Sequence, residues 1–313
     1  MLIAFLYPGQ GSQQVGMGKE FAEKFDTVAS VFKLADEVLG IDLATLCFSG
    51  PLTRLTHTIN AQPAIVTVDY AISLLYLENG VDPCYVSGHS VGTFAALVTA
   101  GVIGFADAIL VVRERGRLMN QVQAPGLMAG VTVANEARLA DVAAVLEEES
   151  VEIGCYNSQS QIIISGEDKR IRRVMDRLRD WRGTQIVLLN VGHAFHSRLM
   201  EEAKSAFQQY LTSVSFENAR IPVVLNSTGA SETNALKIQK DLVEQFTSPV
   251  RWGLGVEFMV EQGVETFVET GVSRRLQGLN RAFNTRAKTL GTESVAHFRA
   301  NLKQLLAGGG SLD

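Results

Sequence analysis

The sequence predicts an α/β protein in which helices cover both faces of a parallel sheet and a smaller unit is inserted into the chain. Short apolar stretches typical of buried strands alternate along much of the chain with longer stretches of helical apolar spacing. Between residues 126 and 192 this order changes to strand, helix, strand, strand, helix, strand. The first observation predicts the parallel sheet, and the second predicts the inserted unit.

The composition is that of an ordinary globular protein. With 313 residues, 46% hydrophobic and 19% charged, the chain can bury a large core, as one domain with an insertion or as two domains. The net charge of −5 and the lack of a basic stripe argue against a nucleic-acid partner. No stretch predicts a signal peptide or a membrane span, so we expect a cytoplasmic protein without a membrane partner. The cysteines, Cys47, Cys84 and Cys155, are far apart and fit reduced thiols.

Residues 2–6 predict the first buried strand, and the glycine-rich stretch at residues 7–13 predicts a sharp turn after it. The glycine spacing resembles a dinucleotide-binding fingerprint, but Gln14 occupies the position of the third glycine, so that interpretation fails. A loop at this place can instead direct the backbone N–H of Gln10 into a site at the carboxyl edge of the sheet. Taken alone, the loop would be interpreted as a plain turn.

The pentapeptide Gly88-His89-Ser90-Val91-Gly92 joins a short predicted strand to a helix of small residues and has the pattern of a nucleophile elbow. Such a turn forces the serine into a strained backbone conformation and brings strand and helix too close for side chains at Gly88 and Gly92. The hydroxyl of Ser90 would then be exposed at a helix N-terminus, where the N–H of Val91 can donate to an oxyanion. An ordinary strand-to-helix turn is the alternative for the pentapeptide by itself.

Four stretches in the first 125 residues have the apolar spacing of helices: residues 19–39, 62–77, 91–100 and 107–122. The last of them contains Arg113, Arg115 and Arg117, whose spacing of two prevents all three from facing the same side. An arginine that faces a cleft can clamp a carboxylate through two hydrogen bonds. Spacing alone favours a solvated face for each of the three.

The middle of the chain predicts a small ferredoxin-like domain. Its strands are expected at residues 127–133, 151–156, 161–165 and 185–191, and its helices at residues 135–149 and 168–180. We therefore expect residues 126–196 to form this βαββαβ domain. Residues 1–125 and 197–307 would form the large domain, and residues 308–313 a flexible tail.

Two histidines three residues apart, in His193-Ala194-Phe195-His196-Ser197, stand at the join between the two predicted domains. Clefts between domains often hold functional sites, and an imidazole there could take the proton of the Ser90 hydroxyl. Zinc binding by the pair is the alternative, but no third ligand stands nearby and the pair is expected in a loop, so no metal is predicted. His57 and His297 lack such a context and are expected to be surface or packing residues.

The C-terminal part is predicted to complete the large sheet. The expected elements are a strand at residues 222–226, a helix at 238–246, a break at 247–252, a helix ending at 262 and the last strand of the sheet at 264–269.

Seven landmarks, spread over nearly the whole chain, carry a resemblance to a known family. They are Pro8-Gly9-Gln10-Gly11-Ser12-Gln13, Asn60-Ala61-Gln62-Pro63-Ala64, Gly88-His89-Ser90-Val91-Gly92, Arg115-Gly116, Asn157-Ser158, His193-Ala194-Phe195-His196-Ser197 and Pro249-Val250-Arg251-Trp252. In their order and spacing the sequence resembles the malonyl-CoA:acyl carrier protein transacylases, and among them the discrete acyltransferases that serve polyketide synthases in trans. The resemblance implies an α/β-hydrolase-like large domain with a ferredoxin-like insert. It also implies malonyl-CoA as donor substrate, a phosphopantetheinylated acyl carrier protein as partner and no bound cofactor.

The resemblance assigns the catalytic roles residue by residue. Ser90 would be the acylated nucleophile and His196 its base. The backbone N–H groups of Gln10 and Val91 would form the oxyanion hole. Arg115 would bind the free carboxylate of the malonyl group, which distinguishes it from the two arginines beside it.

Four further residues are implied to shape the site. His89 would belong to the substrate pocket, and Phe195 would narrow that pocket against a branch at C2 of the acyl group. In this family main-chain carbonyls orient the histidine, and Gln245 falls at one such position and Asn157 near another. Both are therefore expected to orient His196.

The sequence departs from the family pattern at three places. Thr93 stands where glutamate is usual, Val91 where leucine is common, and Gly271-Val272-Ser273-Arg274 where Gly-Pro-Gly is usual. Acyltransferases of malonate decarboxylase systems also have valine at the position of Val91 and a small residue at the position of Thr93. The acyl unit and its acceptor therefore stay open at this stage, including a malonyl derivative carried by a carrier protein.

Two other functions remain as alternatives. An acyl hydrolase of the same fold would clear stalled chains from carrier proteins, but a site for neutral acyl chains gains nothing from a buried Arg115. A catalytically silent docking subunit would not need the serine, histidine, arginine and both oxyanion loops in one chain.

Overall fold

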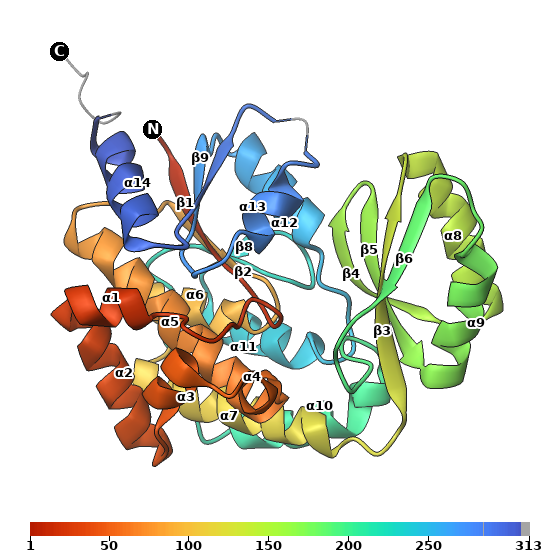
Figure 1. The fold of residues 1–313 in the computed structure, drawn as a ribbon, viewed down its shortest axis with the longest axis horizontal. Helices are drawn as coiled ribbons and strands as arrows, with labels where there is room; N and C mark the ends of the chain where they lie inside the picture. The colour runs from red at the N-terminus through yellow and green to blue at the C-terminus, as the bar shows by residue number, and fades with distance from the viewer. Residues whose placement is uncertain (284, 308–313) are drawn as a thin grey trace.

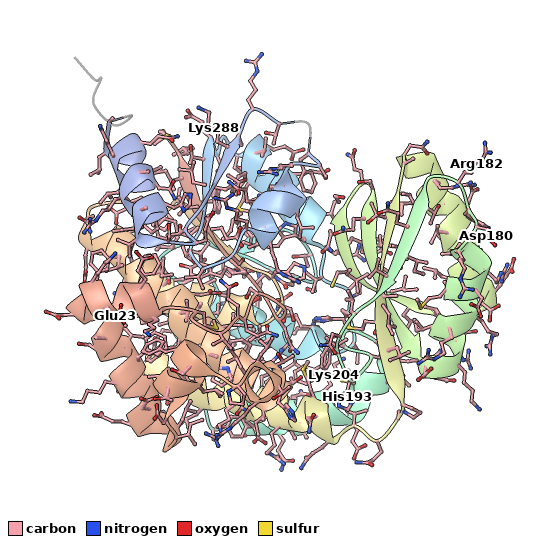
Figure 2. The ribbon with its side chains drawn as sticks, viewed as in Figure 1. Glu23, Asp180, Arg182, His193, Lys204 and Lys288 are labelled. Carbon is pink, nitrogen blue, oxygen red and sulfur yellow. The ribbon has the colours of Figure 1, made fainter. Side chains whose placement is uncertain are left out.

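A computed structural model describes residues 1–283 and 285–307. It contains two separate sheets, a six-stranded one with the order β10-β9-β1-β2-β7-β8 and a four-stranded one with the order β4-β5-β3-β6 (Figure 1). The tail expected at residues 308–313 lies outside the described residues. Charged side chains project from the periphery, as Glu23, Asp180 and Arg182 do in Figure 2.

The large sheet is parallel except at one edge. Its strands are β1 (Ile3–Tyr7), β2 (Tyr85–Gly88), β7 (Val223–Val224), β8 (Ser231–Glu232), β9 (Thr266–Glu269) and β10 (Lys288–Gly291). Only the β7–β8 pair is antiparallel among the described strands of this sheet. Tyr7 pairs with Gly88 at the carboxyl ends of β1 and β2. The glycine-rich loop and the serine turn therefore leave the sheet side by side, as expected for adjacent parallel strands.

Helices pack around this sheet. They are α1 (Lys19–Lys24), α2 (Asp26–Leu39), α3 (Leu43–Ser49), α4 (Leu52–Thr56), α5 (Thr58–Glu78), α6 (Gly92–Thr99), α7 (Phe105–Gln121), α10 (Glu201–Leu211), α11 (Ala235–Glu244), α12 (Trp252–Glu261), α13 (Arg275–Asn280) and α14 (Val295–Ala307), with a 3₁₀ turn η1 (Arg198–Met200). The helix predicted at 19–39 is divided at Phe25, whose extended backbone separates α1 from α2. The Phe25 ring packs against Phe21 and Phe298, so the break serves an aromatic cluster that the local pattern does not encode.

One prediction about the large sheet is wrong. The strand at 264–269 is not the last, because β10 pairs with β9 on its outer side and α14 follows. The sequence of β10, Lys288-Thr289-Leu290-Gly291, holds a single large apolar side chain, and only its last residue is buried. An edge strand can be this polar, since one of its sides does not join the ladder, and the search for apolar runs misses it.

The small sheet is antiparallel throughout. Its strands are β3 (Gly126–Val133), β4 (Glu152–Ser158), β5 (Gln161–Glu167) and β6 (Thr184–Leu188), with α8 (Glu136–Glu148) and α9 (Asp168–Leu178) on the face turned away from the large sheet (Figure 1). The order β4-β5-β3-β6 is that of a ferredoxin-like βαββαβ unit, which confirms the predicted fold class. Among the described helices, none is both long and apolar enough to cross a bilayer.

Backbone hydrogen bonds connect β4 to the segment between α11 and α12. Val250 N–H donates to the Gly154 carbonyl at 2.9 Å, and Tyr156 N–H donates to the Val250 carbonyl at 2.8 Å. Ser165 on β5 also donates to the carbonyl of Phe195 at 2.6 Å. These bonds hold the open face of the small sheet against the carboxyl edge of the large one.

Candidate active site

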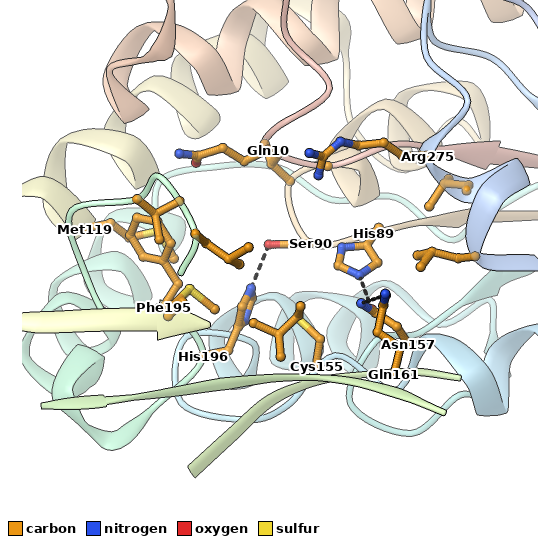
Figure 3. Close-up of a pocket in the computed structure, with 18 of the residues that line it drawn as sticks. Gln10, His89, Ser90, Met119, Cys155, Asn157, Gln161, Phe195, His196 and Arg275 are labelled. Carbon is orange, nitrogen blue, oxygen red and sulfur yellow. Dashed lines mark hydrogen bonds between the residues drawn. The ribbon is translucent and has the colours of Figure 1, made fainter. Parts of the chain in front are cut away.

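A cavity of about 360 Å³ lies where the two sheets meet (Figure 3). Gln10, Ser90 and Arg115 line it from the large sheet and its helices, and Asn157 and Gln161 line it from the small sheet. Every residue that the sequence singled out as catalytic, oxyanion-binding or substrate-binding lines this cavity. Segments far apart in the chain therefore converge on one site.

Ser90 occupies the strained turn that the pentapeptide predicts. Its φ of 53° is in the left-handed region, which is uncommon for a residue with a side chain. A Cβ on Gly88 would lie 2.0 Å from the Thr93 backbone nitrogen, and one on Gly92 would lie 2.2 Å from the Tyr7 carbonyl oxygen. Both glycines are therefore required by the close approach of β1, β2 and α6.

Asn226, which the sequence analysis did not assign to the site, holds this turn from outside. The Ser90 N–H donates to Asn226 Oδ1 at 2.8 Å, and Asn226 Nδ2 donates to the Gly88 carbonyl at 2.7 Å. The side chain is buried just after β7. Its position directly after a strand at the carboxyl edge of a parallel sheet is a signal that could have identified it.

His196 faces Ser90 as a base must. Its Nε2 lies 2.9 Å from Ser90 Oγ, and its Nδ1 lies 2.6 Å from the main-chain carbonyl of Gln245. Because a carbonyl only accepts, Nδ1 carries the proton and Nε2 presents its lone pair to the hydroxyl. Burial, with a smaller effect of the Arg115 charge, lowers the pKa of His196 to about 3. The imidazole is therefore neutral at neutral pH and able to accept a proton.

The side chain of Gln245 is itself fixed by buried neighbours. Its Nε2 donates to Thr93 Oγ1 at 3.3 Å and to Asp241 Oδ2 at 3.4 Å. The Thr93 hydroxyl in turn donates to the carbonyl of Gly88 at 3.1 Å. Thr93, at one of the positions where the sequence departs from the family pattern, thus links the serine turn to the residue that orients His196.

Arg115 points into the cavity and is 2% exposed. Its Nη1 donates to Gln62 Oε1 at 2.9 Å and its Nη2 to Ser90 Oγ at 3.3 Å. Across residues 1–283 and 285–307 no carboxylate pairs with it, and its Nε has no hydrogen-bond partner. Burial lowers the pKa of Arg115 to about 9, so it stays a cation at neutral pH. Arg115 is therefore a buried positive charge without an anionic partner in the described chain.

The other two arginines of α7 lie outside the cavity. Arg113 donates to the Leu39 carbonyl at 3.1 Å, and Arg117 forms two hydrogen bonds with Glu114. Spacing alone could not select among the three arginines, whereas the packing of α7 turns only Arg115 inward.

The two predicted oxyanion donors lie on the same cavity wall as Ser90. Gln10 and Val91 both line the cavity. Within the described part of the chain, neither backbone N–H donates to another protein group. The Gln10 side chain donates to Thr58 Oγ1 at 3.2 Å, which fixes the loop. Both amides thus lack a protein acceptor in the described chain, which is compatible with the predicted oxyanion role.

One predicted residue has a different partner from the expected one. Asn157 was expected to orient His196, but its Oδ1 lies 3.0 Å from Nε2 of His89 and its Nδ2 donates to Gln161 Oε1 at 3.1 Å. The physical reason is that β4 carries Asn157 to the opposite side of Ser90 from His196 (Figure 3). Asn157 therefore orients His89, whose pKa is lowered chiefly by burial.

Phe195 lines the cavity at the end where Met119 lies, and Arg275 lies on the other side of Ser90 (Figure 3). Phe195 is 7% exposed, and the centroid of its ring lies 6.0 Å from the centroid of the His193 ring. A bulky, buried ring at this place limits the width of the cavity beside Ser90. The role implied by the resemblance, exclusion of a branched acyl group, stays a prediction.

Comparisons with known proteins agree with this geometry. A family model described as acyl transferase domain matches residues 4–305. A malonyl CoA-acyl carrier protein transacylase of Bacillus subtilis strain 168 is 36% identical over 292 residues, 92% of this chain and 92% of that protein. BaeC of Bacillus velezensis, named a polyketide biosynthesis malonyl CoA-acyl carrier protein transacylase, is 36% identical over 282 residues, 89% of this chain and 95% of that protein.

A solved structure extends the similarity to three dimensions. It contains PlMCAT and AntF, described as a type II PKS acyl-carrier protein in complex with its malonyl-transacylase. The TM-score is 0.91 at 34% identity, and the match covers 97% of this chain and 100% of that one. The chain therefore belongs to the acyl transferase family that includes the malonyl CoA-acyl carrier protein transacylases.

Proposed function

We propose that this protein transfers a malonyl group from malonyl-CoA, through an ester on Ser90, to the phosphopantetheine thiol of an acyl carrier protein. The observation that carries the proposal is the buried Arg115 guanidinium, which has no carboxylate partner in the described chain and lies 3.3 Å from Ser90 Oγ. A negatively charged acyl group would supply that partner. The names of the relatives and the carrier protein complex support the same donor and acceptor.

In the first half-reaction His196 Nε2 takes the hydroxyl proton while Ser90 Oγ attacks the thioester carbonyl carbon. The N–H groups of Gln10 and Val91 stabilise the negative oxygen of the tetrahedral intermediate. The C–S bond then breaks, and the proton on His196 passes to the departing coenzyme A thiolate. Malonyl-Ser90 remains.

In the second half-reaction the carrier thiol gives its proton to His196, and its sulfur attacks the malonyl ester. The tetrahedral intermediate collapses, the ester C–O bond breaks, and the proton returns to Ser90 Oγ. Arg115 holds the malonyl carboxylate throughout and keeps the reacting carbonyl in place. An acetyl group would leave the buried guanidinium without its anion, and the site thereby discriminates against it.

Several narrower predictions accompany this proposal. The product would serve fatty acid or polyketide synthesis, and the type suggested by the sequence is a discrete acyltransferase that acts in trans. We further propose that the reaction needs no bound cofactor and takes place in the cytoplasm.

Mass spectrometry of the intact protein tests the proposal most directly. The protein is mixed with malonyl-CoA, methylmalonyl-CoA or acetyl-CoA, and the variants Ser90→Ala and Arg115→Ala are treated in parallel. We expect a malonyl adduct on the wild type and none on Ser90→Ala. In the wild type acetyl transfer should be much slower than malonyl transfer, and only in Arg115→Ala should the two rates become similar.

The same experiment separates the alternatives. Rapid release of free malonate without a carrier protein would support a hydrolase instead. If malonyl-CoA yields neither adduct nor malonate, the proposal is wrong for coenzyme A donors, and a donor bound to a carrier protein becomes the next substrate to test.

A further inference from the structure

The turn Gly271-Val272-Ser273-Arg274, which departs from the family pattern, directs a second arginine to the catalytic cavity. The next residue, Arg275, begins α13 and lines the cavity. Its guanidinium lies over Gly11, where a Cβ would be only 2.7 Å from Nη1. Figure 3 shows it on the side of Ser90 opposite to Phe195. Arg275 is therefore part of the site although no catalytic role requires it.

The guanidinium of Arg275 has no partner among the described residues. It forms no ion pair and donates no hydrogen bond there, whereas Arg274 pairs with Glu293 and donates to His297 Nε2 at 3.1 Å. Glu269, the acid whose charge raises the pKa of Arg275, accepts hydrogen bonds from the Ser273 hydroxyl and from the N–H of Gln277. Among the residues that the structure describes, no acidic side chain lines the cavity, and partial burial is the main cause that lowers the pKa of Arg275. Because Arg275 is exposed and lines the cavity, its N–H donors are open to solvent or to a ligand bound there.

The two arginines differ in burial and in the histidine that each affects. The charge of Arg115 lowers the pKa of His196, whereas the charge of Arg275 lowers the pKa of His89. Arg115 is buried and lies 3.3 Å from Ser90 Oγ, and Arg275 is exposed. The cavity therefore has a buried, inner cation beside Ser90 and an exposed, outer cation.

The order of the groups fixes the direction of a bound thioester. Its carbonyl carbon carries an oxygen, which faces Gln10 and Val91, and a methylene whose carboxylate reaches Arg115. The third substituent is sulfur, and we place it toward Arg275, because Arg115, Phe195 and His196 are buried whereas Arg275 is exposed. The arm attached to sulfur therefore passes Arg275.

We infer that Arg275 binds the pantetheine arm by donating a hydrogen bond to one of its amide carbonyls, an inference that rests on the proposed function. The lining of the cavity also contains the side-chain amides of Asn157 and Gln161 and the apolar Leu276 and Leu279 of α13, the helix that Arg275 begins. Such walls match an arm in which amides alternate with short hydrocarbon segments. Coenzyme A and the carrier protein share this arm, so Arg275 acts in both half-reactions.

Donors of different length test the inference. Initial acylation rates are measured with malonyl-pantetheine, which lacks the phosphates, with malonyl-CoA and with acetyl-pantetheine, for wild type, Arg275→Leu and Arg274→Leu. We expect Arg275→Leu to lower kcat/KM by about 10- to 100-fold, and equally for both malonyl donors, because the lost bond has a charged donor. The ratio of malonyl to acetyl transfer should not change. Arg274→Leu, the neighbouring surface arginine, should stay within about twofold of wild type.

Three results for Arg275→Leu would overturn the inference. A loss of kcat/KM confined to malonyl-CoA would mean that Arg275 binds phosphate, and a lower malonyl-to-acetyl ratio would mean that it binds the acyl carboxylate. An unchanged kcat/KM with every donor would mean that it binds none of these groups. Failure of the proposed function is distinguishable, because then the wild type itself would form no malonyl-enzyme with either donor. Thermal unfolding of each variant establishes that the compared proteins are folded.

Discussion

The arginines of the catalytic cavity and those of helix α9 have the same chemistry but opposite surroundings. Along α9 and its ends, Arg170, Arg172, Arg173, Arg177 and Arg179 each form an ion pair with an aspartate or glutamate. Arg115 is buried with no such partner in the described chain. Exposed pairs stabilise a fold little, whereas a lone buried cation opposes folding. The difference shows that an arginine indicates a binding site when it is buried and also lacks a carboxylate partner.

The comparison is tested most severely by replacing one arginine of each kind with methionine. We expect Arg115→Met to lower kcat/KM for malonyl-CoA by about a hundredfold to a few thousandfold, since the substrate carboxylate would be buried without its partner. Arg173→Met should leave acylation unchanged. Initial rates of malonyl-enzyme formation provide the measurement. A similar loss in both variants, or a loss below tenfold in Arg115→Met, would contradict the distinction.

Two buried asparagines extend the comparison from charges to amides. Asn226 holds Ser90 and Gly88, whereas Asn301 donates to the Tyr76 hydroxyl at 3.1 Å and to the Gly291 carbonyl at 2.8 Å, away from the cavity. Each change to alanine should lower the free energy of unfolding by about 1 to 3 kcal/mol.

Only Asn226→Ala should also slow acylation, by about tenfold or more, because the strained Ser90 loses its support. Urea unfolding and acylation rates of both variants decide the matter. If Asn301→Ala slowed acylation as much, the effect of Asn226 would be one of general stability.

The pH profile of acylation reports the surroundings of His196. Because its pKa is lowered to about 3, the base stays neutral as the pH falls from 8 to 5, and kcat/KM should change less than about threefold over this range. A histidine in water would instead give an inflection near 6.5. If the wild type showed that inflection and a variant with only His89 replaced lost it, His89 would be the titrating base. The assignment of the base to His196 would then be wrong.

The same shift has a consequence for stability. The folded pKa lies below the unfolded value, so the unfolded chain binds the extra proton as the pH falls below about 6.5. The contribution of neutral His196 to stability is present above that pH and is lost as the pH falls toward 3. Control spectra of the folded protein are therefore needed at the acid end of the activity profile.

The smallest effect is expected at the surface pairs. Arg177 joins Glu148 at 2.6 Å and Glu149 at 3.2 Å; Arg177 and Glu148 are exposed, and Glu149 is partly buried. Arg177→Ala should shift Tm by only about 2 °C or less and should do so less at high salt, without any effect on acylation. A large, salt-independent drop in Tm would show that these pairs support the fold and would weaken the contrast with Arg115.

Local rules account for much of what could be predicted. The alternation of apolar runs predicted the sheet and the inserted unit, and the spacing Gly88-His89-Ser90-Val91-Gly92 predicted a turn that has no room for side chains beside Ser90. Such features depend on neighbours in the chain. By contrast, the polar edge strand β10 follows no apolar pattern, and β10 was missed for this reason.

The choice among like residues required more than local pattern. Arg113, Arg115 and Arg117 are equivalent by spacing, and the family resemblance, not the spacing, selected Arg115. Asn226 and Arg275 belong to no motif and were missed. The position of Asn226 after a strand at the carboxyl edge of the sheet could have indicated it, whereas nothing beside Arg275 in the chain indicates a site.

The sequence by itself determined the fold class, the elbow that exposes Ser90 and the residues capable of serving it. Only the tertiary structure decided that His196, 106 residues away in the chain, lies 2.9 Å from that serine, that Asn157 serves His89 instead, and that Arg275 reaches the same cavity. The reason is physical. Backbone conformation and periodicity follow from adjacent residues, whereas contacts between distant segments depend on how the two sheets and their helices pack together.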